Sequence, residues 1–278
     1  MNMSEITNQN LSGVAETLLL PLYFRAIESQ RPDALLKDEK AVALVQQMSF
    51  DFSRIKQAKH DEESQVAVAL RNREFDRYAR GFMARYPEAV VVHIGCGLDA
   101  RFERVHNGKA EWYDLDLPEV IDLRRKFIGG EGERYHLLAY SMFDNAWLDA
   151  VSVQRQRPFL FLVEGVLMYF EEAQVKSLVL MLRDHFPGAE LVFDAFSRFF
   201  VWASNRRVAR SKFGACCHWA LKRGKDLESW GDGIRLLGSW FPFSCPEPRL
   251  AHIQWIRYIP LLAKTIGVFY YRLGETAG

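Results

Sequence analysis

The sequence contains few cysteines, almost no net charge and no long apolar run, and each shortage excludes a class of protein. Its 4 cysteines among 278 residues form no C-x-x-C pair of the kind that binds zinc; they are Cys96, Cys216, Cys217 and Cys245. We therefore expect free thiols, no metal site and a cytoplasmic protein. The net charge is only +1, and basic runs such as Arg206-Arg207 are short, so no nucleic-acid partner is expected.

Signals for export or membrane insertion are also missing. The segment from Met1 to Ser12 is polar and holds no apolar h-region, so no signal peptide is expected. No stretch approaches the roughly 20 consecutive apolar residues that a spanning helix needs, so we expect no membrane contact. A chain of this length with 49% hydrophobic residues suits one integrated domain with a large core.

The hydrophobic pattern changes near Pro87 from helical to alternating strand and helix. Upstream, apolar residues recur at three- and four-residue steps, as at Leu18, Leu22 and Ala26, which predicts helices over residues 13–82. Downstream, short apolar runs predict five buried strands, at residues 89–94, 111–115, 135–139, 158–163 and 190–194. Helical segments are expected between them at residues 118–127 and 171–185, the first with Pro118 at its start.

Strands that alternate with helices predict an α/β fold, a doubly wound and mostly parallel seven-stranded sheet with helices on both faces. The last two strands are expected near residues 253–257 and 268–272, at the edge of the sheet. The same pattern predicts three regions: an N-terminal helical cap (1–86), a cofactor-binding Rossmann-like core (87–196 and 250–278) and an α-rich, substrate-side insertion after the fifth strand (197–249).

The strongest local motif is a glycine turn directly after the first predicted strand, in His93-Ile94-Gly95-Cys96-Gly97-Leu98-Asp99-Ala100-Arg101. Such a turn lets the backbone approach a nucleotide-like ligand near a helix N-terminus. Taken alone it is ambiguous, because Gly95-x-Gly97-x-x-Ala100 also fits the dinucleotide fingerprint, and a turn without any ligand can use the same glycines. Arg101 is a candidate partner for a ligand carboxylate; a surface arginine is the alternative.

Carboxylates follow two of the predicted strands. Asp114 and Asp116 stand at the end of the second strand, where an acidic residue accepts hydrogen bonds from ribose hydroxyls in doubly wound folds. Capping of the next helix is the alternative role for Asp116. Glu164 ends the fourth strand, beside the expected ligand crevice, where it can accept bonds from a cofactor ammonium or polarise a substrate group. A buried, neutral or capping glutamate is the alternative.

Three ordered motifs carry a family resemblance. They are Gly-x-Gly-Leu-Asp-x-Arg from Gly95, Trp-Tyr-Asp-Leu-Asp-Leu-Pro-Glu-Val from Trp112, and Glu-Gly-Val-Leu-Met-Tyr from Glu164. Together they resemble the leucine carboxyl methyltransferase superfamily, and within it the tetracenomycin-type branch of polyketide carboxyl O-methyltransferases. The resemblance spans roughly residues 14–196. It implies a class I methyltransferase fold and an enzyme that uses S-adenosyl-L-methionine to methylate a small molecule, on the carboxylate of a polyketide-like or other aromatic or apolar metabolite.

The resemblance also implies which residues bind the methionine end of the cofactor. Gly95 and Gly97, with Cys96 between them, would line this end. Arg71 or Arg73 would lie near its carboxylate. Glu164 would contact its amino group.

At the nucleoside end, the resemblance implies that Asp116 holds the ribose and that Ser141 and Met142 flank the adenine. Two positions depart from the pattern. His93 stands where the family often has Asp or Glu, which would weaken a contact with the cofactor ammonium there. Ser141 stands where the protein-phosphatase branch has an Asp, which points away from that branch.

The methyl acceptor is constrained by acid–base chemistry. A carboxylate is already ionised at neutral pH and needs no base, whereas a phenol, with a pKa of about 10, benefits from one. His218, in the insertion, is the candidate base if the acceptor is a hydroxyl; an incidental histidine is the alternative. Aromatic residues also gather after the fifth strand and either wall an apolar substrate or pack the insertion: Phe196, Phe199, Phe200, Trp202, Trp219, Trp230, Trp240 and Phe241.

Two other functions fit parts of the sequence. An NAD(P)-dependent oxidoreductase could use the same glycine turn. No Tyr-x-x-x-Lys pair follows the fourth strand, however, and the motif from Glu164 has no role in that class. A non-catalytic S-adenosylmethionine-binding homologue is the other alternative. The intact Gly95, Gly97, Asp116 and Glu164 argue against it.

Overall fold

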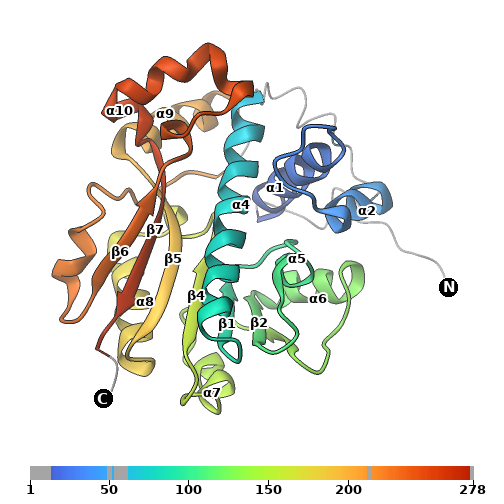
Figure 1. Ribbon diagram of the computed structural model, residues 1–278, viewed down its shortest axis with the longest axis vertical. Helices are drawn as coiled ribbons and strands as arrows, with labels where there is room; N and C mark the ends of the chain where they lie inside the picture. Colours follow the sequence, from blue (N-terminus) through green and yellow to red (C-terminus); the bar gives the residue numbers. More distant parts are fainter. Residues whose placement is uncertain (1–13, 49–51, 53–61, 212–214, 276–278) are drawn as a thin grey trace.

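The computed structural model describes residues 14–48, 52, 62–211 and 215–275. Its elements, with η for a 3-10 helix, run along the chain (Figure 1) as α1 (Val14–Ser29), α2 (Glu39–Gln47), α4 (Glu62–Arg85), β1 (Val90–Ile94), α5 (Arg101–Val105), β2 (Glu111–Asp116), α6 (Pro118–Phe127), β3 (Tyr135–Ala139), α7 (Ala146–Ser152), β4 (Phe159–Val163), η1 (Leu167–Tyr169), α8 (Glu172–His185), β5 (Ala189–Phe196), α9 (Arg198–Ser211), η2 (Asp226–Trp230), β6 (Arg235–Trp240), η3 (Pro242–Ser244), η4 (Pro248–Tyr258), α10 (Pro260–Ala263) and β7 (Ile266–Leu273).

These strands form one seven-stranded sheet in the order β3-β2-β1-β4-β5-β7-β6. The first five strands in the chain are parallel to one another. β7 runs antiparallel to both β5 and β6. The predicted doubly wound, mostly parallel sheet is therefore confirmed. The chain winds outward from β1 in one direction and from β4 in the other, so the topological switch point, where such folds bind ligands, lies between these two strands.

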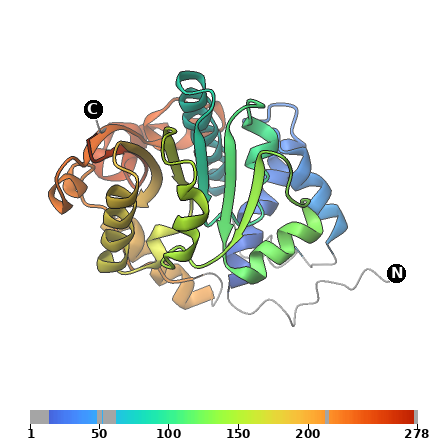
Figure 2. The ribbon, with the colours of Figure 1, turned by 90° about the horizontal axis from the view of Figure 1, so that it is seen from below.

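Helices cover both faces of the sheet, and the alternation of side chains along each strand decides which residue meets which helix. Val90, Val92 and Ile94 of β1 pack in one core cluster with α7 and α8. Val91 packs on the opposite face with α4, α5 and α6, and His93 shares that face by the two-residue period. Figures 1 and 2 show α4 and α8 on opposite sides of the sheet.

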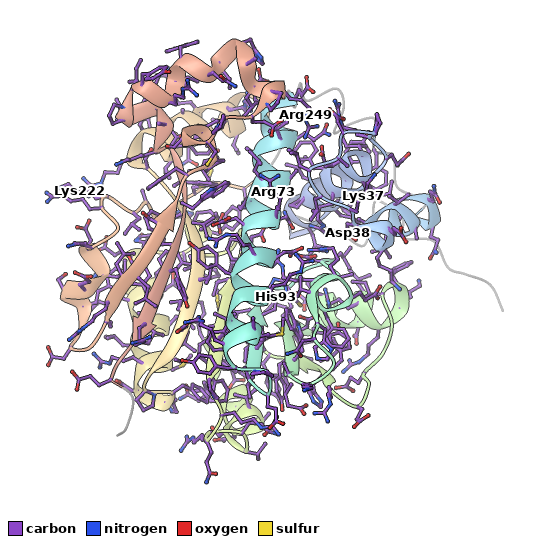
Figure 3. The ribbon with its side chains drawn as sticks, in the orientation of Figure 1. Lys37, Asp38, Arg73, His93, Lys222 and Arg249 are labelled. Carbon is purple, nitrogen blue, oxygen red and sulfur yellow. The ribbon has the colours of Figure 1, made fainter. Side chains whose placement is uncertain are left out.

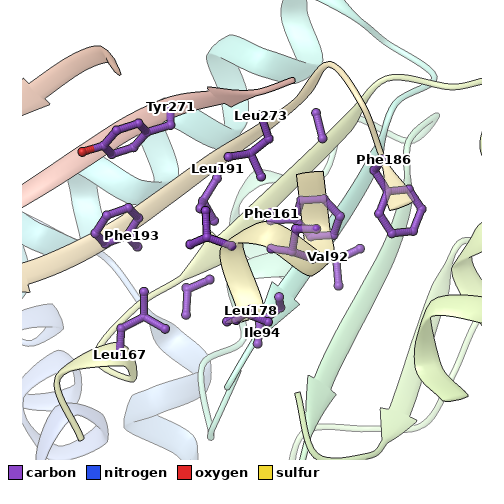
Figure 4. Close-up of a cluster of buried hydrophobic side chains, with 14 of the residues drawn as sticks. Val92, Ile94, Phe161, Leu167, Leu178, Phe186, Leu191, Phe193, Tyr271 and Leu273 are labelled. Atoms are coloured by element: carbon purple, nitrogen blue, oxygen red, sulfur yellow. The ribbon is translucent and has the colours of Figure 1, made fainter. Parts of the chain in front are cut away.

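The core cluster under α8 shows why the strands read as continuous apolar runs. Phe161 and Phe193 of neighbouring strands are completely buried, and Phe186 closes the cluster at the end of α8 (Figure 4). A parallel sheet covered on both faces needs apolar residues at every strand position. Full burial of each such side chain contributes about 1.5–3 kcal/mol, so this cluster holds the central strands rigidly under the site.

One of the two strands predicted near the C-terminal end is present and the other is not. Residues 268–272 lie in β7, as predicted, but the strand expected at 253–257 is wrong, because these residues belong to η4. Pro248 begins this helix and the Glu247 side chain caps it by accepting from the Arg249 N–H, a combination that favours helical turns. The remaining strand is β6, which lies within region 197–249. That region therefore supplies both helix α9 and a strand of the sheet.

The N-terminal helices pack beside the glycine turn. α1 and α2 share a core cluster with Leu98 and Ala100 of the turn and with Ile128, and Figure 1 shows them next to α5 and α6. The cap therefore contacts the loop directly. Within the described part of the chain, no helix combines the length and apolar character needed to cross a membrane.

Candidate functional site

The glycine turn leaves β1 at the switch point and needs glycine for its shape. Gly95 and Gly97 have φ of +67° and +51°, in the left-handed region that favours glycine. A Cβ on Gly95 would lie 2.4 Å from Cγ2 of Val166. The Gly95 N–H donates to the Leu115 carbonyl at 2.8 Å. Cys96 turns its side chain into the core, where burial raises the pKa of the thiol well above its ordinary value, so only its backbone can face a ligand.

Asp116 lies against this turn. Its Oδ2 accepts a hydrogen bond from the Gly97 N–H at 2.8 Å, and its Oδ1 accepts one from the Leu117 N–H at 2.8 Å. The side chain keeps some exposure. Burial raises the pKa of this carboxyl above the ordinary aspartate value. Each carboxylate oxygen still has a free lone pair, so Asp116 can accept hydrogen bonds from hydroxyls of a ligand that lies on the turn.

Asp114, predicted for the same role, is fully buried below the turn. Its carboxylate accepts from Trp112 Nε1 at 2.8 Å and from the Tyr135 hydroxyl at 2.7 Å, and it forms an ion pair with Arg124. Burial alone would raise its pKa, but the Arg124 guanidinium and neighbouring hydrogen bonds hold that pKa below its ordinary value. The structure therefore brings Asp116, and not Asp114, to the surface of the turn.

Glu164 follows β4 and joins two arginines. Its Oε1 accepts from Arg71 Nε at 2.9 Å, and its Oε2 accepts from Arg101 Nη2 at 2.5 Å. Arg71 also donates through Nη1 to Asp194 Oδ2 at 2.9 Å. Its Nη2 donates to none of the described residues, so Arg71 retains a donor for a ligand carboxylate. The next glycine, Gly165, has φ of +72° and donates its N–H to Asp194 at 2.6 Å.

Arg101 lies deeper than predicted. It has no exposed surface and pairs with Asp76 and Asp99 at 2.8 and 3.0 Å in addition to Glu164. We name the surrounding set of four guanidiniums and five carboxylates the ion cluster; it comprises Arg25, Arg71, Arg101, Arg104, Asp38, Asp76, Asp99, Glu164 and Asp194. Arg101 therefore orients Glu164 from below.

Arg71 and Arg73 lie on different faces of α4. Arg71 faces the ion cluster, whereas Arg73 is exposed, because two residues along a helix turn a side chain by about 200°. Figure 3 shows Arg73 on the upper part of α4. The structure thus brings only Arg71 next to Glu164.

His93 lies between the ion cluster and Asp114, behind α4 in the view of Figure 3. Its ring is 2% exposed. Nε2 lies 3.2 Å from Arg101 Nη1, and Nδ1 lies 3.5 Å from Asp114 Oδ1. Because a guanidinium only donates, Nε2 acts as the acceptor and Nδ1 carries the proton. His93 is therefore a buried bridge below the turn and does not reach its surface.

Ser141 and Met142 follow β3 at the same edge of the sheet. The Ser141 hydroxyl accepts from the Phe143 N–H at 3.3 Å, and Met142 packs partly buried against the main core cluster. The preceding Tyr140 N–H donates to the Asp116 carbonyl at 3.0 Å. Both residues therefore lie close to Asp116, at the side of the turn away from Glu164.

His218 lies on a strap of residues 215–221 that is hydrogen-bonded to η1, which follows β4, and to the end of β5. Its N–H donates to the Met168 carbonyl at 2.7 Å. Its side chain is 50% exposed and places Nδ1 3.2 Å from Glu171 Oε1. The aromatic residues around the strap divide: Trp219 is buried in the core, whereas Phe199 and Trp202 of α9 are exposed.

Several residues of this site were not predicted from the sequence. Asp194 follows the apolar run Leu191-Val192-Phe193 within β5, and a carboxylate after such a run is a signal that could have identified it. Asp76 and Arg124 lie on helices among other charged residues, so their burial could not be predicted. Only the structure shows that they support the turn.

Comparison with known proteins places this geometry in a class. The leucine carboxyl methyltransferase family profile matches residues 19–182. The chain is 34% identical over 241 residues to the tetracenomycin polyketide synthesis O-methyltransferase TcmP of Streptomyces glaucescens, which covers 85% of this chain and 86% of TcmP. It is 31% identical over 263 residues to the S-adenosyl-L-methionine-dependent methyltransferase dpfgK of Gibberella zeae, with 88% of each covered.

A solved structure supports the fold. A DUF574 family protein of Streptomyces avermitilis superposes with a TM-score of 0.58 at 16% identity, over 92% of this chain and 96% of that one. The fold and the sequence matches together define an S-adenosylmethionine-dependent methyltransferase. The chain belongs to the leucine carboxyl methyltransferase family.

The arrangement of donors and acceptors fits this cofactor. Asp116 offers acceptors to ribose hydroxyls, Glu164 offers an acceptor to an ammonium, and Arg71 offers Nη2 to a carboxylate. A Cβ on Gly97 would meet only the side chain of Leu18, at 3.8 Å, so the turn is open where the backbone must approach a ligand. The side-chain roles remain predictions, and the turn provides the surface that they require.

The raised pKa of Asp116 predicts how cofactor binding depends on pH. Below this pKa the carboxyl is protonated and has fewer acceptors for ribose hydroxyls. Affinity for S-adenosylhomocysteine should therefore be constant above the pKa and fall as the pH drops through it. Calorimetric titrations from about pH 4 to about pH 8 measure this, in a range where a surface aspartate stays ionised until about pH 4.

The stability of the free protein depends on pH in the opposite direction from its affinity for the cofactor. A carboxyl whose pKa is raised by folding binds its proton more tightly in the folded state, so this group makes folding more favourable as the pH falls. Asp116→Asn is the control: it should bind more weakly at neutral pH and lose the pH dependence. An equal pH dependence in this variant would assign the titration to another group.

Proposed function

We propose that this chain transfers a methyl group from S-adenosylmethionine to a carboxylate oxygen of a small polyketide-like or other aromatic or apolar metabolite, forming a methyl ester. The similarity to dpfgK, an S-adenosyl-L-methionine-dependent methyltransferase, supports the methyl donor, and the similarity to the O-methyltransferase TcmP supports oxygen as the acceptor. The position of His218 supports a carboxylate. His218, the predicted base, forms a pair with the exposed Glu171 and does not join the ion cluster.

The chemistry makes limited demands on side chains. S-adenosylmethionine, when bound, supplies an electrophilic methyl group on a sulfonium. The acceptor oxygen must lie in line with it, and orientation of two reactants can supply most of the rate enhancement. A carboxylate already carries the lone pair and negative charge that are needed at neutral pH. No proton has to be removed, so a site without a buried base is sufficient.

The residues of the chain then have two tasks toward the methyl donor. Asp116 holds the ribose, and the glycine turn beside it lines the methionine end. Arg71 and Glu164 hold the charged methionine end, and both are themselves fixed by buried partners, which restricts their rotamers. Because ion pairs in the ion cluster are shielded from water, they position these groups more rigidly than surface pairs do.

The acceptor side is formed by the strap and α9. Asn205 of α9 binds the strap twice: its Oδ1 accepts from the Cys217 N–H and its Nδ2 donates to the Cys217 carbonyl, both at 2.8 Å. The strap is held at its other end by a hydrogen bond from the Leu221 N–H to the Phe196 carbonyl at 3.0 Å. The strap and α9 are therefore joined beside the end of β5, an arrangement that suits a cover for an apolar substrate.

The acceptor class is tested by His218→Ala. With a carboxylate acceptor we expect kcat to change less than threefold and its pH profile to stay the same. A phenol acceptor that relied on this histidine would lose about 10²- to 10⁴-fold. His136→Ala is the matched control, since this histidine also pairs with a glutamate, Glu111, at 3.0 Å but lies on β3 near the opposite end of the sheet.

The product provides the second readout. Extracts incubated with methyl-labelled cofactor should yield a product whose label is released by dilute alkali, because methyl esters hydrolyse there and aryl ethers do not. A label that resists alkali would overturn the proposed ester while leaving O-methylation in place. Binding of NADH instead of S-adenosylhomocysteine would overturn the methyl donor itself.

The state of the cysteines bears on the cellular compartment. All four cysteines are free thiols, which supports a reducing environment, and we propose the cytoplasm.

A further inference from the structure

Arg124 of α6 makes contacts that the proposed function does not use. Its Nη1 donates to the carbonyls of Gly97 and Asp99 at 2.6 and 2.9 Å, and lies 3.5 Å from the carbonyl of Cys96. These three carbonyls belong to the turn between β1 and α5. The guanidinium is fully buried. A single buried cation therefore gathers the carbonyls of the loop on which the cofactor is proposed to lie.

The other end of this guanidinium is fixed by Asp114 and Tyr135. Arg124 Nη2 pairs with Asp114 Oδ2 and donates to the Tyr135 hydroxyl at 2.8 Å. The Tyr135 hydroxyl in turn donates to Asp114 at 2.7 Å, and Trp112 Nε1 donates to the second oxygen of Asp114 at 2.8 Å. Both oxygens of Asp114 are thus occupied, which leaves Arg124 little freedom to rotate.

The turn depends on this support because it has few other constraints. Its N–H groups at Gly95 and Cys96 donate to the Leu115 carbonyl, and that of Gly97 donates to Asp116. The carbonyls of Cys96, Gly97 and Asp99 face Arg124, whereas that of Leu98 accepts from Arg25 Nη2 of α1 at 3.0 Å. A planar guanidinium with several donors can contact three carbonyls and a carboxylate at once. The donors of the turn are therefore held by β2, and most of its acceptors by Arg124 of α6.

We propose that Arg124, fixed by Asp114, is a positioning residue that holds the glycine turn in its cofactor-binding shape before the cofactor arrives. A loop already ordered in its bound conformation binds more tightly, because less ordering is needed on binding. This inference rests on the proposed function for the nature of the ligand. It also explains why two aspartates occur two residues apart on β2: Asp116 faces the ligand, and Asp114 holds Arg124 in place.

A purely structural role makes a different prediction, and Tyr135 allows the two to be separated. Its hydroxyl contacts Arg124 and Asp114 but none of the turn carbonyls. Tyr135→Phe leaves the pair between Arg124 and Asp114 and the bonds from Arg124 to the turn carbonyls in place, so it should lower stability without changing the turn. Arg124→Met should release the carbonyls as well.

The experiment compares the wild-type protein with Arg124→Met, Arg124→Lys and Tyr135→Phe. Calorimetry with S-adenosylhomocysteine, at a temperature where each variant is folded, should show binding weakened about 10-fold or more for Arg124→Met, as is common when outer partners of ligand-binding groups are removed. Arg124→Lys keeps the charge but cannot span three carbonyls and should fall between. Tyr135→Phe should stay within twofold. KM for the cofactor should rise while KM for the acceptor stays constant.

Hydrogen exchange of the amides of residues 95–100 in the free protein is the second readout. We expect faster exchange in the Arg124 variants than in Tyr135→Phe. Should Arg124→Met fail to fold, Arg124→Lys gives the same comparison. Unchanged loop exchange in a folded Arg124 variant would overturn the inference, and so would a loss of affinity no larger than that of Tyr135→Phe. Failure of the wild type to bind S-adenosylhomocysteine would instead overturn the proposed function, and the exchange data would still decide the role of Arg124.

Discussion

Replacing Arg101 by methionine is expected to destabilise the protein by about 3–5 kcal/mol, the range for removing one partner of a buried ion pair. The reason is the number of charges that this side chain compensates. Asp76, Asp99 and Glu164 all lie within 3.0 Å of its guanidinium, and Asp76 and Asp99 are buried. Each of the three keeps a second arginine, Arg104 or Arg71, but the ion cluster loses one of the positive charges that balance its carboxylates, and an unbalanced buried charge is far more costly than a lost surface pair.

Urea unfolding monitored by tryptophan fluorescence measures this change. Arg73→Met is the matched control, because it makes the same substitution on the exposed side of α4 and should alter stability by no more than about 0.5 kcal/mol. Equal stabilities for the two variants would show that water or a rearranged neighbour replaces Arg101. In that case Glu164 would not depend on the ion cluster for its position.

Replacing Gly95 by alanine is expected to cost about 2–5 kcal/mol and to abolish cofactor binding. Two effects add. A non-glycine residue in the left-handed region costs about 1–2 kcal/mol, and the new Cβ would lie 2.4 Å from Val166 Cγ2, an overlap that typically costs about 1–3 kcal/mol to relieve. Because Val166 follows Gly165 in the segment after β4, relief of the overlap would separate the turn from Glu164.

Gly108→Ala separates the two effects. Gly108 has φ of +77°, but nothing lies within 4 Å of a Cβ placed there, so only the backbone term applies. Adding Val166→Ala to Gly95→Ala should recover the overlap term and not the backbone term. Thermal melts of these three variants and the wild type test this, and equal melting temperatures for Gly95→Ala and Gly108→Ala would show that the overlap is absorbed elsewhere.

The parts of the fold that were predictable are those where local sequence and tertiary setting agree. The five parallel strands are covered on both faces, so their sequences are largely apolar, and these apolar runs predict the strands. β6 lies at the edge of the sheet, its residues alternate between exposed and half-buried positions, and its pairing is irregular between Leu236 and Gly238. No apolar run marks such a strand. The β-like run at 253–257 instead lies within η4, which begins at Pro248.

The site was predictable in its position and less so in its details. Strand ends and a glycine turn point to one edge of the sheet, and Gly95, Asp116 and Glu164 do lie there. The two-residue spacing of Asp114 and Asp116 places both on one face but cannot tell which is covered. Arg71 meets Asp194 across 123 residues of sequence, and a contact of that separation leaves no local pattern.

The ion pair between Glu28 and Arg249 has a consequence for synthesis of the chain. Arg249 donates to both oxygens of Glu28 at 3.0 and 2.9 Å, across 221 residues of sequence, and the Glu28 side chain is fully buried. Chains emerge from the ribosome N-terminus first, so α1 is made long before the cation that neutralises its carboxylate. The Glu28 carboxylate therefore gains its buried cation only after residue 249 has been made, and we expect α1 to reach its final packing late in folding.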